Sequence, residues 1–162
     1  VEIGACFGYY SELLCKNIPG LKLISIDNWS NTANKYRERT SGRSGEEVTR
    51  EKLAPYNATV IKKNSVDAAK DIQDNSLDFV FIDADHRYAA VKSDIKAWAP
   101  KVRKGGIVAG HDYYVFPSGN RGVIDAVNEY VEINGCDLKL IDWDKSNPVR
   151  DDRPPCWYFF KV

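Results

Sequence analysis

The hydrophobic positions of the chain fall into short runs that alternate with segments of helical spacing. Five of these runs have the length and composition of β-strands, and they lie at residues 1–3, 21–26, 58–62, 77–82 and 107–109. The run at 77–82, LDFVFI, is apolar almost throughout, as is typical of a strand buried on both faces. Two more strand-like segments, 138–143 and 157–162, are separated by a polar loop that contains proline, which predicts an antiparallel pair.

Helices are predicted between the strands, at residues 9–17, 66–72, 88–98 and 120–133. In the third of these segments, Val91, Ile95 and Trp98 recur at four- and three-residue spacing and so share one face of the helix. The polar segment 31–52 carries both signs of charge and predicts a surface excursion with some helix. Trp98, Trp143 and Trp157 are predicted to pack in the core or in the terminal hairpin.

This order of elements predicts a single α/β domain of Rossmann-like type. Its sheet should be open and mostly parallel, with helices on both faces and an antiparallel hairpin at the end. Ligands of such sheets bind beyond the carboxyl ends of the strands, where strand order reverses. Polar clusters follow four of the predicted strands, at residues 4–8, 27–29, 83–86 and 110–114, so a binding site is expected at that edge.

The composition of the chain argues against a nucleic-acid-binding or membrane protein. The 23 Lys and Arg residues balance 23 Asp and Glu residues, which leaves no global field that would favour nucleic acid or an anionic membrane. No apolar stretch approaches the about 20 residues that span a bilayer, and VEIGACFGYY lacks the features of a signal peptide, so we expect a cytoplasmic location and reduced cysteines. The four cysteines lack C-x-x-C spacing, which gives no support to a zinc knuckle or a thioredoxin-like site. The chain contains no methionine and begins within a predicted strand, so we expect the natural protein to begin upstream. The sequence leaves open whether the chain forms a homo-oligomer.

The turn after the first strand, EIGACFG, has features of a nucleoside site. Gly4 and Gly8 let the backbone pass close to a ligand, and the next helix offers free N–H groups to a carboxylate or phosphate. Glu2, within the strand, is unusual in a core and requires a polar partner. Asp27 ends the second strand, where an acid can accept hydrogen bonds from both ribose hydroxyls, and Trp29 could cover an adenine. Taken singly, an ordinary glycine turn and a helix cap explain these residues; taken together, they favour the nucleoside site.

Acidic and imidazole side chains follow two later strands. Asp83, Asp85 and His86 come after the strand at 77–82, and His111 and Asp112 after the next one. Adjacent parallel strands lie about 4.8 Å apart, so these groups can converge on one point. Oxygen ligands with at most one imidazole suit Mg²⁺, Mn²⁺ or another divalent ion. The alternative is that the aspartates cap strand ends and the histidine bonds its own loop.

On these residues the sequence resembles the class I S-adenosylmethionine-dependent methyltransferases. The likeness is sharpest at IDADHRY, residues 82–88, and KGGIVAGHDY, residues 104–113. With the closing strand CWYFFKV, these segments resemble the methyltransferase domain 24 family, which is similar to metal-dependent O-methyltransferases of sugars and other small molecules. The resemblance covers essentially the whole chain. It implies a seven-stranded sheet of order 3-2-1-4-5-7-6 with the last strand antiparallel, and methyl transfer from S-adenosylmethionine to a hydroxyl of a small-molecule acceptor such as a sugar.

The resemblance also implies roles for individual residues. The metal ligands would be Asp83, His111 and Asp112, with histidine in place of one acid of the family. Asp85 matches the position of the family's proposed base, and His86 is its rival. Asn64 and Ser65 should lie near the adenine. The full set of implied cofactor contacts is Glu2, Gly4, Ala5, Gly8, Asp27, Asn28, Trp29, Asn64, Ser65 and Asp83.

Two other functions stay open at the level of sequence. A nicotinamide-dependent oxidoreductase also uses a glycine turn and an acid after the second strand, although this chain lacks G-x-G-x-x-G and has an acid inside the first strand. A non-catalytic domain could keep the same fold as a module that binds the cofactor or a partner. Preferential binding of NADH would favour the first, and cofactor binding without turnover would favour the second.

Overall fold

The structure, a computed structural model, describes residues 1–30, 42–147 and 153–162, and the chain divides into two compact units, residues 1–68 and 69–162. The seven strands follow the order β3-β2-β1-β4-β5-β7-β6, and β7 runs antiparallel to both of its neighbours. The predicted strand order and the antiparallel last strand are therefore confirmed. Among the described residues, no helix has the length and apolar character that crossing a bilayer requires.

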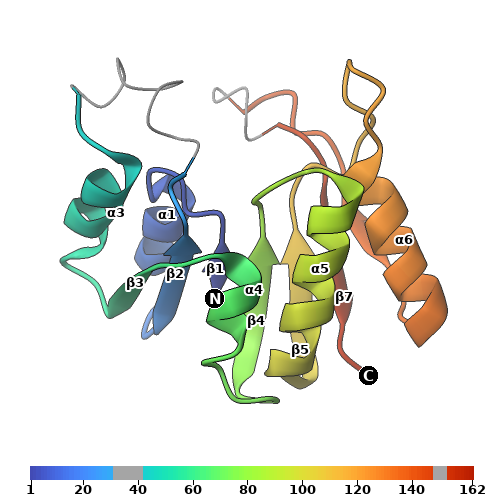
Figure 1. Ribbon diagram of the computed structural model, residues 1–162, viewed down its shortest axis with the longest axis horizontal. Helices are drawn as coiled ribbons and strands as arrows, with labels where there is room; N and C mark the ends of the chain where they lie inside the picture. The colour runs from blue at the N-terminus through green and yellow to red at the C-terminus, as the bar shows by residue number, and fades with distance from the viewer. Residues whose placement is uncertain (31–41, 148–152) are drawn as a thin grey trace. The chain divides into compact units, whose positions relative to one another are not determined.

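The first unit contains three parallel strands, and its elements are visible in the blue to green part of Figure 1. Strand β1 pairs with β2 so that Glu2 lies opposite Ser25, and β2 pairs with β3 so that Asp27 lies opposite Lys62. All three strands therefore end at the same edge. The elements are β1 (Glu2–Ile3), α1 (Tyr9–Asn17), β2 (Leu23–Asp27), α3 (Gly45–Leu53), β3 (Ala58–Lys62) and α4 (Ser65–Ala69), whose last residue belongs to the second unit.

The polar segment 31–52 contains a helix, as predicted, in its second half. Helix α3 begins where Ser44 and Glu47 form a capping box: the Ser44 hydroxyl accepts from the Glu47 amide, and the Glu47 carboxylate accepts from the Ser44 amide. Val48 and Leu53 are buried along the inner face of this helix. Residues 31–41 of the segment lie outside the described part of the chain.

The second unit places helices α5 and α6 side by side along its strands (Figure 1). Strand β4 is parallel to β5, whereas β7 lies antiparallel between β5 and β6. Its elements are β4 (Leu77–Ile82), α5 (Tyr88–Trp98), the short 3₁₀ helix η2 (Ala99–Lys101), β5 (Val102–Gly110), α6 (Gly122–Asn134), β6 (Lys139–Ile141) and β7 (Cys156–Phe160). Strand β4 and helix α5 have the predicted bounds.

The core of the second unit contains the helix face that the sequence pattern predicted to be apolar. Val91, Ile95 and Trp98 of α5 are all buried, which confirms the predicted helix face, and Trp157 of β7 is buried too. Trp143 differs: 44% of it is exposed, because it follows β6, whose three residues are all exposed. Trp143 therefore does not lie in the core, although its ring contacts that of Tyr114.

Strand β5 is longer than the apolar run that predicted it. Val102 pairs with Leu77 and Ile107 pairs with Phe79, so the register slips and the intervening residues form a bulge on the β5 side. Gly105 has a φ of +73° in this bulge, a conformation that L side chains rarely adopt. Gly105 and Gly106 thus lie in a bulge inside β5, which begins five residues before the strand predicted at 107–109.

Candidate functional site

The turn after β1 forms a tight loop that leads into α1. Gly4 and Gly8 have φ values of +94° and +69°, and Cys6 between them also has a positive φ, +52°. The amides of Gly4 and Ala5 both donate to the Ile26 carbonyl of β2, at 2.8 and 3.2 Å. Among the residues that the structure describes, no side chain caps the start of α1. The loop and the first turn of α1 therefore present backbone N–H groups that suit the carboxylate of a ligand.

Asp27 ties this loop to the end of β2. One carboxylate oxygen accepts from the Cys6 amide at 2.9 Å, and the other accepts from the Trp29 amide at 2.7 Å. A carboxylate has about four acceptor positions, so these two bonds fix its orientation and leave acceptor capacity for the hydroxyls of a ribose. The predicted place of this acid, beside the glycine turn, is what the structure shows.

Helix α3 closes over the same loop, a contact that the sequence did not predict. Trp29 is buried, and its indole N–H donates to the Cys6 carbonyl at 2.7 Å. The Thr49 hydroxyl of α3 lies 3.4 Å from the same carbonyl. A Cβ at Gly45 would come within 2.6 Å of that oxygen and 2.7 Å of the Trp29 ring. The indole therefore helps to hold the loop. The sequence predicted only a contact of this ring with adenine.

Glu2 has the polar partners that its position in a core strand required. Its carboxylate accepts hydrogen bonds from the hydroxyls of Ser11 on α1 and Ser25 on β2, and the two hydroxyls lie 2.9 Å from each other. All three residues are buried. The structure thus gives Glu2 a place in the packing between β1, β2 and α1, and its predicted cofactor contact stays a prediction.

The remaining first-unit candidates lie at the ends of β2 and β3. Asn28 is exposed and accepts from the amide and hydroxyl of Ser30. Asn64 follows β3, accepts from the Val66 amide at 3.1 Å, and so caps α4, which begins at Ser65. The carboxyl ends of three adjacent parallel strands therefore bring together the glycine turn, the ribose-type acid and the residues predicted to lie near the adenine.

In the second unit, two carboxylates and two imidazoles converge at the ends of β4 and β5. Nε2 of His86 lies 3.4 Å from Asp83 and 3.1 Å from Asp112. Nδ1 of His111 lies 3.8 Å from Asp83 and 3.5 Å from Asp112. Among the described residues, Asp83, His86 and Asp112 form the set whose ligand atoms all lie within 4.8 Å of one another. The predicted convergence of these strand ends is thus observed, and His86 lies within it.

The environment of this cluster shapes its chemistry. Asp112 is buried and has a φ of +59°, which turns the chain sharply after β5. A hydrogen bond to Asp83, together with the charge of Asp112, raises the pKa of His86 although burial opposes the shift. His86 also stacks on the Phe116 ring, with centroids 5.3 Å apart. Asn120, whose side-chain amide donates to the His86 carbonyl, carries no motif that could have identified it from sequence.

Asp85 lies beside the cluster but faces Arg87. Nε of Arg87 donates to both carboxylate oxygens, at 3.0 and 2.8 Å, and the Arg87 amide donates to one of them at 2.9 Å. The side-chain hydrogen bond to Arg87 is the main cause of a lowered pKa at Asp85. The Arg87 side chain is 82% exposed, so this pair is open to solvent and can separate.

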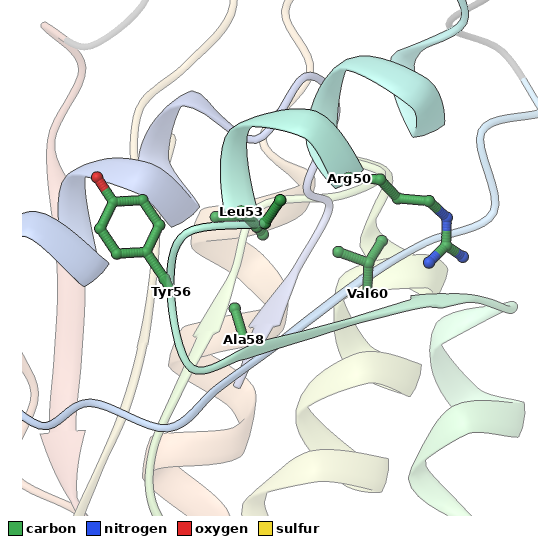
Figure 2. Close-up of a pocket in the computed structure, with 6 residues that line it drawn as sticks. Arg50, Leu53, Tyr56, Ala58 and Val60 are labelled. Atoms are coloured by element: carbon green, nitrogen blue, oxygen red, sulfur yellow. The ribbon is translucent and has the colours of Figure 1, made fainter.

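A hollow on the first unit is lined by residues other than these. Figure 2 shows it against α3 and β3, lined by Arg50, Leu53, Tyr56, Ala58 and Val60. Its lining includes none of the predicted cofactor residues of the described chain, and it offers no convergent acid, imidazole or glycine turn. We therefore assign it no role in the chemistry of the site.

Comparison with known proteins identifies the family to which this fold and these strand-end residues belong. The chain matches the model of a methyltransferase domain, the methyltransferase domain 24 family, over residues 1–113. The chain belongs to this methyltransferase family. It is also 27% identical over 128 residues to the Sinorhizobium fredii protein y4gI, whose own function is uncharacterised. That match covers 74% of this chain and 13% of the relative, so the chain spans a small part of that protein.

Solved methyltransferase structures share the fold. An O-methyltransferase from Bacillus cereus, in complex with S-adenosylhomocysteine, matches 99% of this chain and 72% of its own, with 16% identity and a TM-score of 0.66. A TDP-rhamnose 3′-O-methyltransferase of calicheamicin biosynthesis matches 98% of this chain and 69% of its own, with 14% identity and a TM-score of 0.60. A precorrin-6y methyltransferase from Geobacter metallireducens matches 99% of this chain and 78% of its own, with 14% identity and a TM-score of 0.66. The class I methyltransferase fold is thus established, while the acceptors named for the second and third of these proteins differ.

Proposed function

We propose that this chain transfers a methyl group from S-adenosylmethionine to a hydroxyl of a small molecule, with help from a divalent metal ion. The observation that carries the proposal is the convergence of two aspartates and two histidines beyond β4 and β5 in a methyltransferase fold. A hydroxyl needs both deprotonation and orientation before it can attack, and a cluster of this kind suits both tasks.

The first unit would hold the methyl donor. The N–H groups of the glycine turn and the start of α1 suit the donor's carboxylate, and Asp27 suits the ribose hydroxyls. Asn64 and Ser65 would lie near the adenine. When bound, S-adenosylmethionine supplies an electrophilic methyl group, which passes to the acceptor oxygen as its bond to sulfur breaks.

The second unit would hold the metal and the acceptor. The donor set suits a divalent ion, because carboxylates and an imidazole are ligands that such ions accept, and Nδ1 of His111 lies 3.8 Å from Asp83 and 3.5 Å from Asp112. A bound divalent ion would lower the pKa of a hydroxyl and fix its direction of attack. Asp85 and His86 are our two candidates for accepting the hydroxyl proton.

An aromatic row beside the cluster supports a ring-shaped acceptor such as a sugar. The rings of Phe116 and Tyr114 lie 4.4 Å apart, and those of Tyr114 and Trp143 lie 5.1 Å apart. Because Trp143 is partly exposed, its ring offers an apolar face on which the C–H groups of a sugar can pack. We propose no nucleic-acid or membrane partner, and a cytoplasmic location stays a prediction from the sequence.

The test begins with calorimetric titrations of S-adenosylhomocysteine and NADH, each with and without Mg²⁺. We expect micromolar binding of S-adenosylhomocysteine and no signal for NADH. Asp27→Asn should weaken that binding about 10- to 100-fold, since charge-assisted hydrogen bonds contribute about 1.5–3 kcal/mol. Asp74→Asn, which changes an exposed carboxylate paired with Lys101, is the matched control and should bind normally.

Either of two results would overturn the assignment of the donor. Preferential binding of NADH would indicate an oxidoreductase. If a well-folded sample binds neither ligand, the assignment of a cofactor site is wrong. If S-adenosylhomocysteine binds, methyl transfer from labelled S-adenosylmethionine to a panel of sugars and other hydroxylated small molecules tests the reaction itself. Binding without transfer to any member of the panel would favour a non-catalytic module.

A further inference from the structure

Both histidines of the chain contact the same two aspartates. From this geometry we propose that His86 is a fourth metal ligand beside Asp83, His111 and Asp112, and that the site therefore selects a transition-metal ion over Mg²⁺. The inference rests on the proposed function in one respect, the presence of a metal at this cluster. It removes His86 from the role of proton acceptor and gives it a role in holding the ion.

The ligand atoms of His86, Asp83 and Asp112 have the spacing of ligands around one ion, since they all lie within 4.8 Å of one another. Metal–ligand bonds of about 2.1 Å that meet at tetrahedral or octahedral angles place neighbouring ligand atoms about 3.0–3.4 Å apart. Nε2 of His86 lies 3.1 Å from Asp112 and 3.4 Å from Asp83, within that range. Nδ1 of His111 lies slightly farther from the same carboxylates, at 3.5 and 3.8 Å. By distance, His86 is the better placed of the two imidazoles.

Three contacts from neighbouring segments hold His86 in this position. Its ring stacks on Phe116, with an angle of 21° between the planes. The Asn120 side-chain amide donates to its carbonyl at 3.2 Å. Gly122, at the start of α6, approaches so closely that a Cβ there would lie 2.4 Å from that carbonyl oxygen. Contacts of this kind fix the orientation of a histidine ring in the absence of the metal ion that it binds.

The donor set predicts which ions bind. Mg²⁺ prefers an all-oxygen environment and keeps several waters, whereas imidazole favours Zn²⁺, Co²⁺, Ni²⁺ and Fe²⁺. Two imidazoles and two carboxylates therefore favour the second group. With its Nε2 lone pair on the ion, His86 could accept no proton, and Asp85 would be the nearby acceptor once its exposed pair with Arg87 opened.

The experiment uses the full chain, with Zn²⁺ and Mg²⁺ as probes. Because the chain has two histidines, a ¹⁵N spectrum of the imidazoles resolves each ring nitrogen separately. Saturating Zn²⁺ should shift Nε2 of His86 and Nδ1 of His111 together, since coordination changes the shielding of the bonded nitrogen. By calorimetry, Zn²⁺ should bind at least about 100-fold more tightly than Mg²⁺, in line with the ligand preferences of the two ions.

Variants sharpen this test. His86→Gln should weaken Zn²⁺ binding about 10-fold or more and change Mg²⁺ binding little, because it removes a nitrogen ligand. The matched control is Asp78→Asn, which alters an exposed carboxylate near the other end of β4, paired with Arg103, and should bind Zn²⁺ normally. The spectrum of the unmodified chain keeps the inference testable even if His86→Gln folds poorly.

Each result has a distinct meaning. A Zn²⁺-induced shift at His111 alone would overturn the inference and leave the metal-assisted function standing. No shift at either histidine, with Mg²⁺ or Zn²⁺, would overturn both the inference and metal assistance. Methyl transfer that persists in the presence of a chelator would count against metal assistance alone and leave the donor assignment intact.

Discussion

Glu2 illustrates how much a single buried residue can demand of its surroundings. An ionisable group in a core costs several kcal/mol unless hydrogen bonds replace its water, and Ser11 and Ser25 supply two such bonds. The need for a partner could be read from an acid within an apolar strand. The identity of the partners could not, because Ser25 faces Glu2 only through the register of β1 and β2, and Ser11 only through the packing of α1.

At this scale we predict that Glu2→Leu lowers the free energy of unfolding by about 2 kcal/mol, because two buried hydroxyls lose their acceptor. Glu2→Gln, which retains an oxygen acceptor of similar shape, should cost about half as much. Urea denaturation followed by circular dichroism measures both. The triple variant with Ser11→Ala and Ser25→Ala should recover part of the loss seen in Glu2→Leu, since no unsatisfied hydroxyl then remains. Equal stability of Glu2→Leu and the unmodified chain would contradict this account.

Elements with strong local patterns were predicted well, and contacts between distant elements were not. Strand β4 and helix α5 have the predicted bounds because each carries its own period of apolar residues. The packing of α3 on the glycine turn depends on the contacts of Gly45 and Trp29 with the Cys6 carbonyl. These residues are far apart in the sequence, so no local pattern of apolar residues predicts the contacts. The same reason explains the site: residues at strand ends could be named from sequence, whereas the place of His86 between two aspartates, and of Phe116 against it, depends on packing.

The contact of α3 with the glycine turn yields a prediction for that element. Gly45→Ala should destabilise the protein by about 1–3 kcal/mol, because the added Cβ would clash with the Cys6 carbonyl and the Trp29 ring. It should also weaken S-adenosylhomocysteine binding, since the loop that would hold the ligand must shift. Ser44→Ala is the control: it removes the capping box for about 1 kcal/mol but adds no atom at the loop. Equal affinities of these two variants for S-adenosylhomocysteine would show that α3 has no influence on the loop.

At the scale of the whole molecule, fold and family agree and the reaction follows from neither alone. The strand order shows the class I methyltransferase fold, and the family match places the chain in a methyltransferase domain family. Structural relatives with the same fold are named for different acceptors. The acceptor must therefore be argued from particular side chains, and here these are the aspartate–histidine cluster and the aromatic row that ends at Trp143.

A ligand that binds only the folded chain must raise its melting temperature, which gives a test of the donor for the molecule as a whole. At a concentration 100 times its dissociation constant, such a ligand stabilises the folded state by about 2.7 kcal/mol. For a protein of 162 residues, where 1 kcal/mol corresponds to about 2–4 °C, S-adenosylhomocysteine should raise the melting temperature by about 5–11 °C. NADH at the same concentration should leave it unchanged, and Asp27→Asn should lose most of the shift at that fixed ligand concentration because its affinity is lower. An equal rise with both ligands would mean that the glycine turn and Asp27 recognise a nucleoside without distinguishing the methyl donor, and the cofactor assignment would then rest on the family alone.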